Sequence, residues 1–274
     1  MTTGAGRGPG TIVGVPPPLH VHRYGPDGPP RVLALHGLTG HGQRWQRLSD
    51  DHLPGVAVAA PDLIGHGRSP WAAPWSIDAN AAALAALLEA DARDPVAVVA
   101  HSFGAAVALQ LAAARPELVS ALVLLDPAVG LDGAWMQQIA EAMFADPDYT
   151  DAAEARNEKS GGSWGDVDDD VLDAEIDEHL IALPGGRVGW RICIPAMLAY
   201  WSELARDPAV PRTPIPTTVV RARHTHPRYV DDEFVERLGA GLGTVELVEF
   251  DCNHMVPHAK PAETAALIRA ALGS

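Results

Sequence analysis

Ser102 is the residue whose setting most clearly suggests chemistry, because it stands at an abrupt turn between two different stretches. Val96–Ala100 is apolar and partly β-branched, which predicts a strand buried on both faces, and Ala105–Ala114 has the composition of a helix. A serine on a sharp strand-to-helix turn has its hydroxyl lifted clear of the sheet, as a nucleophile requires. Small residues two positions away, Ala100 and Gly104, permit this turn. The simpler alternative is a serine that only caps the helix.

His254 is predicted to be the base that takes the proton of Ser102. It follows the last predicted strand, so its side chain can reach the sheet edge where the serine is expected. The ordinary pKa of histidine, about 6.5, suits proton transfer near neutral pH. Surface exposure is the alternative for a loop histidine, and His258 is the second candidate for the base.

Asp126 is predicted to be the acid that orients His254. It ends the apolar strand Ala121–Leu125, and therefore lies at the same edge of the sheet. The loop 222–227, after the following strand, is the usual place for such an acid but contains no carboxylate. A turn before Pro127 is the structural alternative for Asp126. Structural roles are predicted for three other carboxylates, the first two at a helix start and the third at a strand end: Asp231, Asp232 and Asp251.

An oxyanion formed during acyl transfer needs N–H donors, and two backbone groups are candidates. Phe103 follows the serine directly, and Leu38 follows a glycine at the end of another predicted strand. That glycine lets the chain pass close to a reacting carbonyl. The residues predicted to border the substrate at these strand ends are His36, Gly37, His101 and Met255.

Apolar strands alternate with helical stretches, which predicts an α/β fold with a parallel sheet covered by helices on both faces. The carboxyl ends of parallel strands share one edge, so the candidate residues meet there. The predicted strands are Thr11–Val15, Leu19–Tyr24, Arg31–His36, Val56–Ala60, Val96–Ala100, Ala121–Leu125, Thr217–Arg221 and Val245–Phe250.

The composition changes over residues 131–211, where Asp, Glu, Trp and Met become frequent and no strand-like run interrupts the helical spacing. This predicts a helical insertion that covers the sheet edge as a lid, between the core segments 11–130 and 212–274. Its apolar side chains are candidates for an acyl pocket, with packing inside the insertion as the alternative. These candidates are Trp135, Met136, Phe144, Trp190, Met197 and Trp201.

The overall composition excludes several classes of protein. A chain of 274 residues, 47% of them hydrophobic, can bury a sizeable core as one or two domains. A net charge of −15 argues against nucleic acid and anionic membranes as partners, and no apolar run is long enough to span a membrane. Residues 1–10 predict a flexible tail rather than a signal peptide, and two cysteines, Cys193 and Cys252, predict reduced thiols in the cytoplasm. No motif for a metal or a nucleotide is present, so no cofactor is expected.

Five motifs that span most of the chain resemble the α/β-hydrolase superfamily: His36-Gly37, Asp62–Ser69, Ala100–Gly104, Leu124–Pro127 and Asn253-His254. Three sequence segments resemble those of the LipV-type lipases and esterases of mycobacteria: Ser69–Trp75, Leu124–Ala128 and Tyr200–Ala205. The resemblance implies ester hydrolysis, an eight-stranded, mostly parallel sheet and a helical cap inserted after the sixth strand. It also implies that Asp62 and Gly65–Ser69 form a structural loop under the site. The chain departs from the superfamily at Ala100, which replaces a glycine.

These features together predict a serine hydrolase that cleaves short- to medium-chain carboxylic esters through an acyl-enzyme. The expected partner is a small-molecule ester, and the expected state is a monomer or a small homo-oligomer. The same residues could instead cleave a thioester, an amide or a carbon–carbon bond. A non-catalytic ligand-binding protein is the third possibility. Replacement of Asp126 distinguishes it, because loss of a working acid lowers turnover by about 10³–10⁴.

Overall fold

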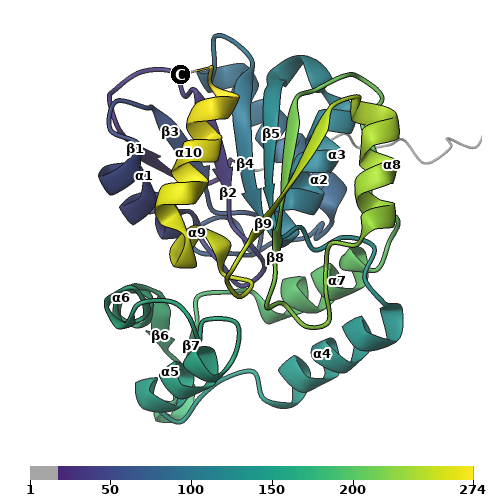
Figure 1. The fold of residues 1–274 in the computed structure, drawn as a ribbon. Coiled ribbons are helices and arrows are strands. Elements are labelled where there is room, and N and C mark those ends of the chain that lie inside the picture. The colour runs from purple at the N-terminus through teal and green to yellow at the C-terminus, as the bar shows by residue number, and fades with distance from the viewer. Residues whose placement is uncertain (1–17, 274) are drawn as a thin grey trace, which may run out of the picture.

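The computed structural model describes residues 18–273, which are built around one large sheet (Figure 1). Within these residues the sheet has seven strands in the order β1-β3-β2-β4-β5-β8-β9, and only the β1–β3 pair is antiparallel. The strands are β1 (Val21–Tyr24), β2 (Val32–Leu35), β3 (Val58–Pro61), β4 (Val96–His101), β5 (Val119–Leu125), β8 (Thr217–Ala222) and β9 (Val245–Phe250). The mostly parallel sheet is confirmed. The tail 1–10 and the strand Thr11–Val15 lie outside the described residues, so an eighth strand stays a prediction.

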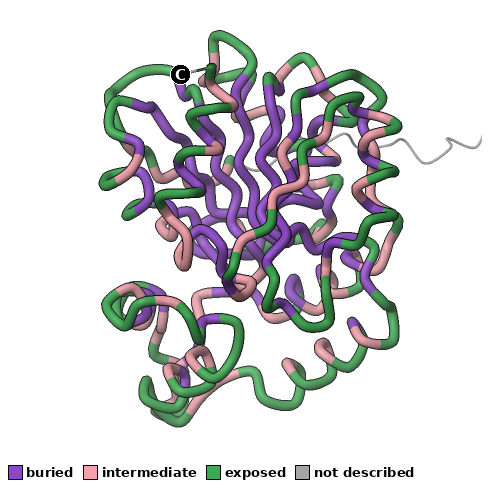
Figure 2. The backbone as a smooth tube through the Cα atoms, in the orientation of Figure 1, coloured by how far each residue is buried: buried purple, intermediate pink, exposed green. Residues whose placement is uncertain are grey.

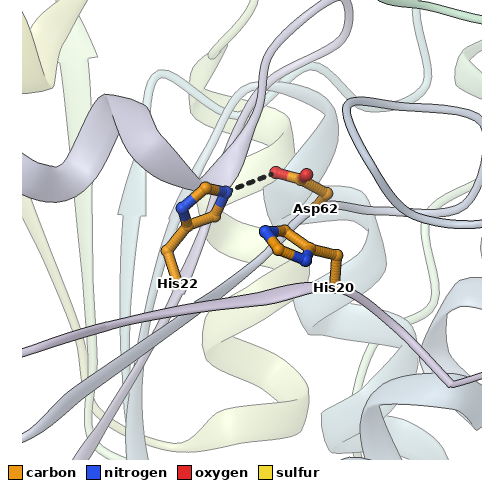
Figure 3. Close-up of side chains that lie close together, drawn as sticks. All are labelled: His20, His22 and Asp62. Carbon is orange, nitrogen blue, oxygen red and sulfur yellow. Dashed lines mark ion pairs between the residues drawn. The ribbon is translucent and has the colours of Figure 1, made fainter.

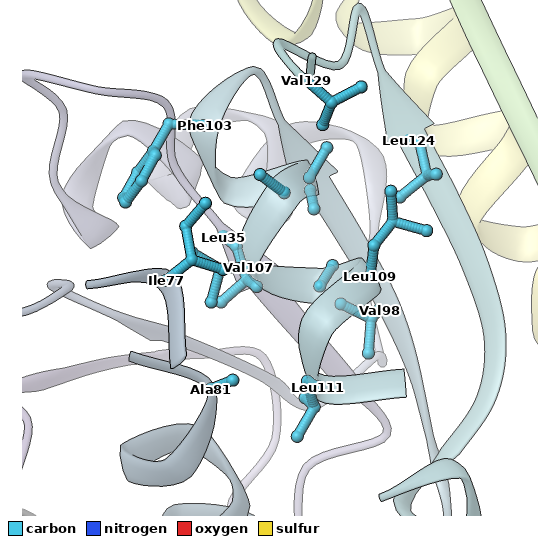
Figure 4. Packing of buried hydrophobic residues seen from close by; sticks show 14 of the residues in the cluster. Leu35, Ile77, Ala81, Val98, Phe103, Val107, Leu109, Leu111, Leu124 and Val129 are labelled. Carbon is cyan, nitrogen blue, oxygen red and sulfur yellow. The ribbon is translucent and has the colours of Figure 1, made fainter. Parts of the chain in front are cut away.

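The central strands are buried on both faces, which explains why their sequences are continuous runs of apolar residues. Successive residues of a strand point to opposite faces, so Leu33 enters one hydrophobic layer and Val32 the other. Figure 4 shows the first of these layers, to which three strands contribute Leu35, Val98 and Leu124. Figure 2 shows the buried strands running through the middle of the molecule between more exposed helices.

Helices cover both faces of the sheet, as predicted (Figure 1). The layer containing Leu33 is closed by α2, α3 and α8, and the opposite layer by α1, α9 and α10. The helices are α1 (Gln46–His52), α2 (Ile77–Asp91), α3 (Phe103–Ala114), α8 (Asp232–Leu242), α9 (Val256–Ala259) and α10 (Pro261–Ala271), with a 3-10 turn, η1 (Gly42–Trp45), before α1. Helix α8 begins at Asp232, because the Asp231 side chain accepts a hydrogen bond from the Phe234 N–H and caps the helix there.

Residues 131–211 gather at the end of the sheet where β4 and β5 finish (Figure 1). They form α4 (Gly133–Ala145), α5 (Ala152–Gly161), α6 (Asp169–His179) and α7 (Ile194–Leu204). The expectation of an uninterrupted helical segment is wrong, because β6 (Leu180–Ala182) and β7 (Val188–Trp190) pair as an antiparallel hairpin. Strands of three residues are too short to show a period of two in the sequence.

Candidate active site

Ser102 occupies a strained turn between β4 and α3. Its backbone angles are φ 54° and ψ −119°, a region that side-chain-bearing residues rarely adopt. The turn is held because the Ser102 N–H donates to the Leu125 carbonyl at 3.0 Å. At Gly104, an added Cβ would lie 2.6 Å from the His36 carbonyl oxygen, so this position has no room for a side chain. Ala100 is fully buried, which shows that a methyl group fits in place of the other expected glycine.

The three residues predicted to act together form one continuous chain of hydrogen bonds. His254 Nε2 lies 2.8 Å from Ser102 Oγ, and His254 Nδ1 lies 2.7 Å from Asp126 Oδ2. A carboxylate oxygen accepts a hydrogen bond, so Nδ1 donates and Nε2 is left to accept the serine proton. Ser102 follows β4, Asp126 follows the neighbouring strand β5, and His254 follows β9, which is separated from β5 in the sheet by β8. The fallback base His258 instead stacks on Trp164, with ring centroids 5.0 Å apart.

The Asp126 carboxylate is held by two further donors, one at the end of β8 and one in the loop that follows β8. The Ala222 N–H donates to Oδ1 at 3.1 Å, and the Thr225 hydroxyl donates to Oδ2 at 2.7 Å. Asp126 is almost completely buried and has a positive φ of 41°, so its carboxylate is fixed by its surroundings. The role of Thr225 was not predicted from the sequence. The loop 222–227, which lacks a carboxylate, supplies a hydroxyl to the carboxylate of the neighbouring strand.

Three other nearby carboxylates, for which the sequence predicted structural roles, have partners other than His254. Asp231 caps α8, and Asp232 forms an ion pair with Arg221 at 2.5 Å. Asp251 is exposed and lies 3.1 Å from His224 Nε2. Asp126 is therefore the carboxylate, among the described residues, that is hydrogen-bonded to His254.

The backbone beside Ser102 leaves two N–H groups available for a ligand. No acceptor among residues 18–273 bonds to the N–H of Leu38 or of Phe103. Gly37 packs directly against the serine, since an added Cβ there would lie 3.0 Å from Ser102 Cβ and 2.9 Å from His101 Nδ1. Phe103 also begins α3, where the helix dipole favours negative charge. This arrangement can receive a developing oxyanion.

Two histidines predicted to border the substrate are engaged within the protein. His101 Nε2 donates to the His254 carbonyl at 2.7 Å, and burial, reinforced by the neighbouring His254, lowers the pKa of His101 well below its ordinary value. His36 Nε2 accepts from the Leu63 N–H at 3.0 Å, while its Nδ1 lies 2.8 Å from the Gly37 carbonyl. These bonds favour positioning roles for both rings rather than contact with a substrate.

The loop after β3, for which the resemblance implied a structural role, is held together by Asp62. The Asp62 carboxylate accepts hydrogen bonds from the N–H groups of Gly42 and Arg68 at 2.7 and 2.8 Å. Burial opposes its ionisation, but these bonds and a contact with His22 outweigh that cost and hold the pKa of Asp62 well below its usual range. Gly67 has a positive φ of 51°, and its added Cβ would lie 2.2 Å from the same carboxylate.

Only part of the predicted acyl pocket lies near His254. The Tyr229 ring meets His254 edge-on at 4.7 Å, and Trp135 packs on Tyr229 at 5.6 Å. Both aromatic residues border a hollow of about 400 Å³. Tyr229 was not predicted to lie at the site, although an aromatic residue in a loop at the carboxyl edge of a sheet is a signal for a site.

The other apolar candidates have different surroundings. Met136 and Met197 are buried in a hydrophobic layer, and Trp201 packs against it. Phe144 is 73% exposed on α4, so the expectation that it lines a pocket is not supported. The Lys159 ammonium group lies over the Trp190 ring, 3.5 Å from the ring centroid. Met255 is buried beside Trp164 and Leu172.

A buried charge cluster joins residues 131–211 to the sheet-bearing part of the molecule. Glu175 of α6, with a side chain 3% exposed, accepts from Arg44 at 2.5 Å, from His41 at 2.8 Å and from Lys159 at 2.8 Å. Burial disfavours the charged forms, yet the neighbouring cations keep the pKa of Glu175 well below its ordinary value. Burial also lowers the pKa of Lys159, to about 8.

The fold and the serine site together define a class of protein. Residues 32–267 match the alpha/beta hydrolase family, which is more than half of the chain, and the chain therefore belongs to that family. The chain is 62% identical over 256 residues to lipase LipV of Mycobacterium tuberculosis (strain ATCC 25618 / H37Rv), which covers 93% of this chain and 98% of that protein. The predicted resemblance is thus confirmed.

Solved structures agree on the fold. An E-2-(acetamidomethylene)succinate hydrolase superposes with a TM-score of 0.76 at 20% identity, covering 93% of this chain and 95% of its own. A marine microorganism esterase superposes with a TM-score of 0.74 at 21% identity, and the match covers 94% of this chain and 99% of the esterase chain. None of the helices in residues 18–273 has the length and apolar character needed to cross a membrane.

Proposed function

We propose that this chain is a serine hydrolase that cleaves carboxylic esters through an acyl-enzyme. The observation that carries the proposal is the hydrogen-bonded chain from Ser102 through His254 to Asp126. Family membership and the 62% identity to a protein named as a lipase support an ester as the substrate. No metal or cofactor is part of the proposed reaction.

The reaction uses the three side chains in turn. His254 Nε2 takes the hydroxyl proton as Ser102 Oγ attacks the ester carbonyl, and the charged imidazole is stabilised by Asp126. The N–H groups of Leu38 and Phe103 bind the oxyanion. His254 then gives its proton to the departing alkoxide, which leaves an acyl group on the serine. Water activated by the same histidine releases the acid and restores Ser102.

The proposed acyl group is short to medium in length. The hollow beside Tyr229 and Trp135 has about 400 Å³ of space, and its wall combines these aromatic rings with charged side chains, among them Asp132 and Arg228. A long alkyl chain gains most from a continuous apolar wall, so this lining supports shorter substrates.

We also propose that residues 131–211 act as a cap over a core formed by residues 11–130 and 212–274. The ion pairs of Glu175 support this division, because they hold α5 and α6 of the proposed cap against η1 of the proposed core. A cytoplasmic location and a monomeric or small homo-oligomeric state stay predictions of the sequence.

Hydrolysis of a p-nitrophenyl ester series, from acetate to palmitate, tests the proposed function. The wild type is expected to turn over short and medium esters, and Ser102→Ala to lose that turnover. Faster turnover of laurate or palmitate than of butyrate would contradict the chain-length proposal. If neither protein turned over any ester, the proposed activity would be wrong.

A further inference from the structure

We infer that His20, His22 and Asp62 form a binding site for a transition-metal ion such as Zn²⁺, outside the serine site. Figure 3 shows both imidazole rings beside the Asp62 carboxylate. One nitrogen of each histidine and one carboxylate oxygen lie within 4.8 Å of one another. Two imidazoles and a carboxylate are ligands that Zn²⁺ binds in proteins, with a fourth position open to water.

The spacing of the first two ligands matches a shared metal better than a direct hydrogen bond. His22 Nε2 and Asp62 Oδ1 are 3.3 Å apart, longer than a charge-assisted hydrogen bond. Two ligand atoms each about 2.1 Å from a tetrahedral Zn²⁺ ion are separated by about 3.4 Å. A metal can therefore replace the proton between this pair with little movement of either side chain.

His20 supplies a third ligand that no other contact requires. Its ring meets His22 edge-on, with centroids 4.7 Å apart, and no side-chain hydrogen bond engages its nitrogens within residues 18–273. Its backbone is fixed, since the His20 N–H donates to Ser69 Oγ at 2.8 Å. Both histidines are partly exposed, so an ion can enter from solvent.

Binding here has a route to the serine site, an effect that rests on the proposed function. Asp62 Oδ1 also accepts the Gly42 N–H, and a metal on that oxygen competes with this hydrogen bond. Loss of this hydrogen bond would release Gly42 and the short segment that connects it to Leu38, without any large movement of His22. We expect the bound metal to slow hydrolysis by displacing the Leu38 N–H.

Calorimetric titration with Zn²⁺ tests the site without any substrate. The wild type is expected to bind one equivalent, and His20→Gln and His22→Gln are each expected to weaken binding roughly tenfold or more. His224→Gln is the matched control, because His224 also pairs with an aspartate but has no second imidazole there. It should bind Zn²⁺ as the wild type does. Unchanged binding in both site variants, or no binding by the wild type at millimolar Zn²⁺, would overturn the site.

The route to Ser102 is tested separately by ester hydrolysis with and without Zn²⁺. Each protein is compared with its own metal-free rate. The wild type and His224→Gln are expected to be slowed at saturating Zn²⁺ and restored by a chelator, whereas His22→Gln is not slowed at the same concentration. Equal slowing of His22→Gln would show that inhibition arises elsewhere, even if calorimetry confirmed the site. A wild type without turnover in the absence of metal would contradict the proposed function and leave the calorimetric result standing.

Discussion

At the scale of single residues, the site depends on groups that act on the three proposed catalytic side chains. The clearest is Thr225, whose hydroxyl donates to the same Asp126 oxygen that contacts His254. A hydrogen bond to a charged group contributes about 1.5–3 kcal/mol. The hydroxyl therefore holds the carboxylate in the orientation that His254 needs.

Replacement of Thr225 by valine is expected to lower kcat about tenfold and to leave KM nearly unchanged, because the hydroxyl orients the acid and touches no substrate. Steady-state kinetics with a p-nitrophenyl ester would measure this change. Thr225→Ser retains the hydroxyl and should retain most of the activity. A Thr225→Val enzyme with the wild-type kcat would show that Asp126 is held without this bond.

His66 gives a residue-level prediction about pH. It is buried beside the rings of Phe103 and Tyr200, its Nδ1 contacts the Ile64 carbonyl, and its Nε2 has no partner among the described residues. Burial lowers its pKa from 6.5 to about 4. Between these values the unfolded chain binds more protons than the folded one, so the free energy of unfolding falls as the pH is lowered.

Urea unfolding between pH 7 and pH 4.5 measures this contribution. His66→Gln can still donate to Ile64 but does not titrate. The free energy of unfolding of this variant should therefore fall less steeply with pH than that of the wild type, and the two slopes should differ by up to about 1.4 kcal/mol per pH unit. Parallel pH profiles for the wild type and the variant would contradict the assignment of this proton to His66.

At the scale of elements, the junction of β4 with α3 holds Ser102, the proposed nucleophile, in place through close packing. Gly104 lies against the end of β2, where an added Cβ would approach the Leu35 and His36 backbone oxygens at 2.9 and 2.6 Å. Backbone atoms inside a sheet cannot move aside as flexible side chains do. The position of Ser102 therefore depends on Gly104, two residues away, having no side chain.

Gly104→Ala is expected to destabilise the protein by about 1–3 kcal/mol and to reduce turnover, because overpacking pushes α3 away from β2. Urea unfolding and ester hydrolysis would measure the two effects. Gly161→Ala, at the end of α5 with no atom within 4 Å of its added Cβ, is the matched control and should change neither. A Gly104→Ala protein as stable as the control would contradict this account of the junction.

The elements that the sequence predicted well are those with strong local signals. Buried parallel strands are apolar along their whole length, and their carboxyl ends share an edge, so the sequence alone could place Ser102, Asp126 and His254 together. Thr225 could not be placed there, because its partner lies 99 positions away and a loop threonine has many uses. The hairpin of β6 and β7 was not predicted because its pairing, not its composition, defines it.

At the scale of the whole molecule, the proposed cap and core meet through buried charge. Arg44 and His41 come from the sheet-bearing part, whereas Glu175 and Lys159 come from residues 131–211. Loss of one partner from such a cluster leaves other charges buried without compensation. The cluster therefore controls whether α5 and α6 stay docked.

Glu175→Gln is expected to destabilise the protein by about 3–5 kcal/mol, because Arg44 and Lys159 lose their counter-charge. Urea unfolding gives the total change, and hydrogen exchange locates the loss in α5 and α6. Asp170→Asn breaks an exposed pair with Arg47 on the same surface, with side chains 69% and 50% exposed, and should cost less than about 1 kcal/mol. Equal effects of the two substitutions would contradict a cap held by buried charge.

The central claim, that Ser102 forms a covalent acyl-enzyme, is tested most directly by intact-protein mass spectrometry after reaction with a p-nitrophenyl phosphonate. The wild type is expected to gain one phosphonyl group and lose activity, with peptide mapping placing the group on Ser102. Ser102→Ala should gain no mass. Labelling at another residue, or ester turnover that persists in Ser102→Ala, would contradict the claim.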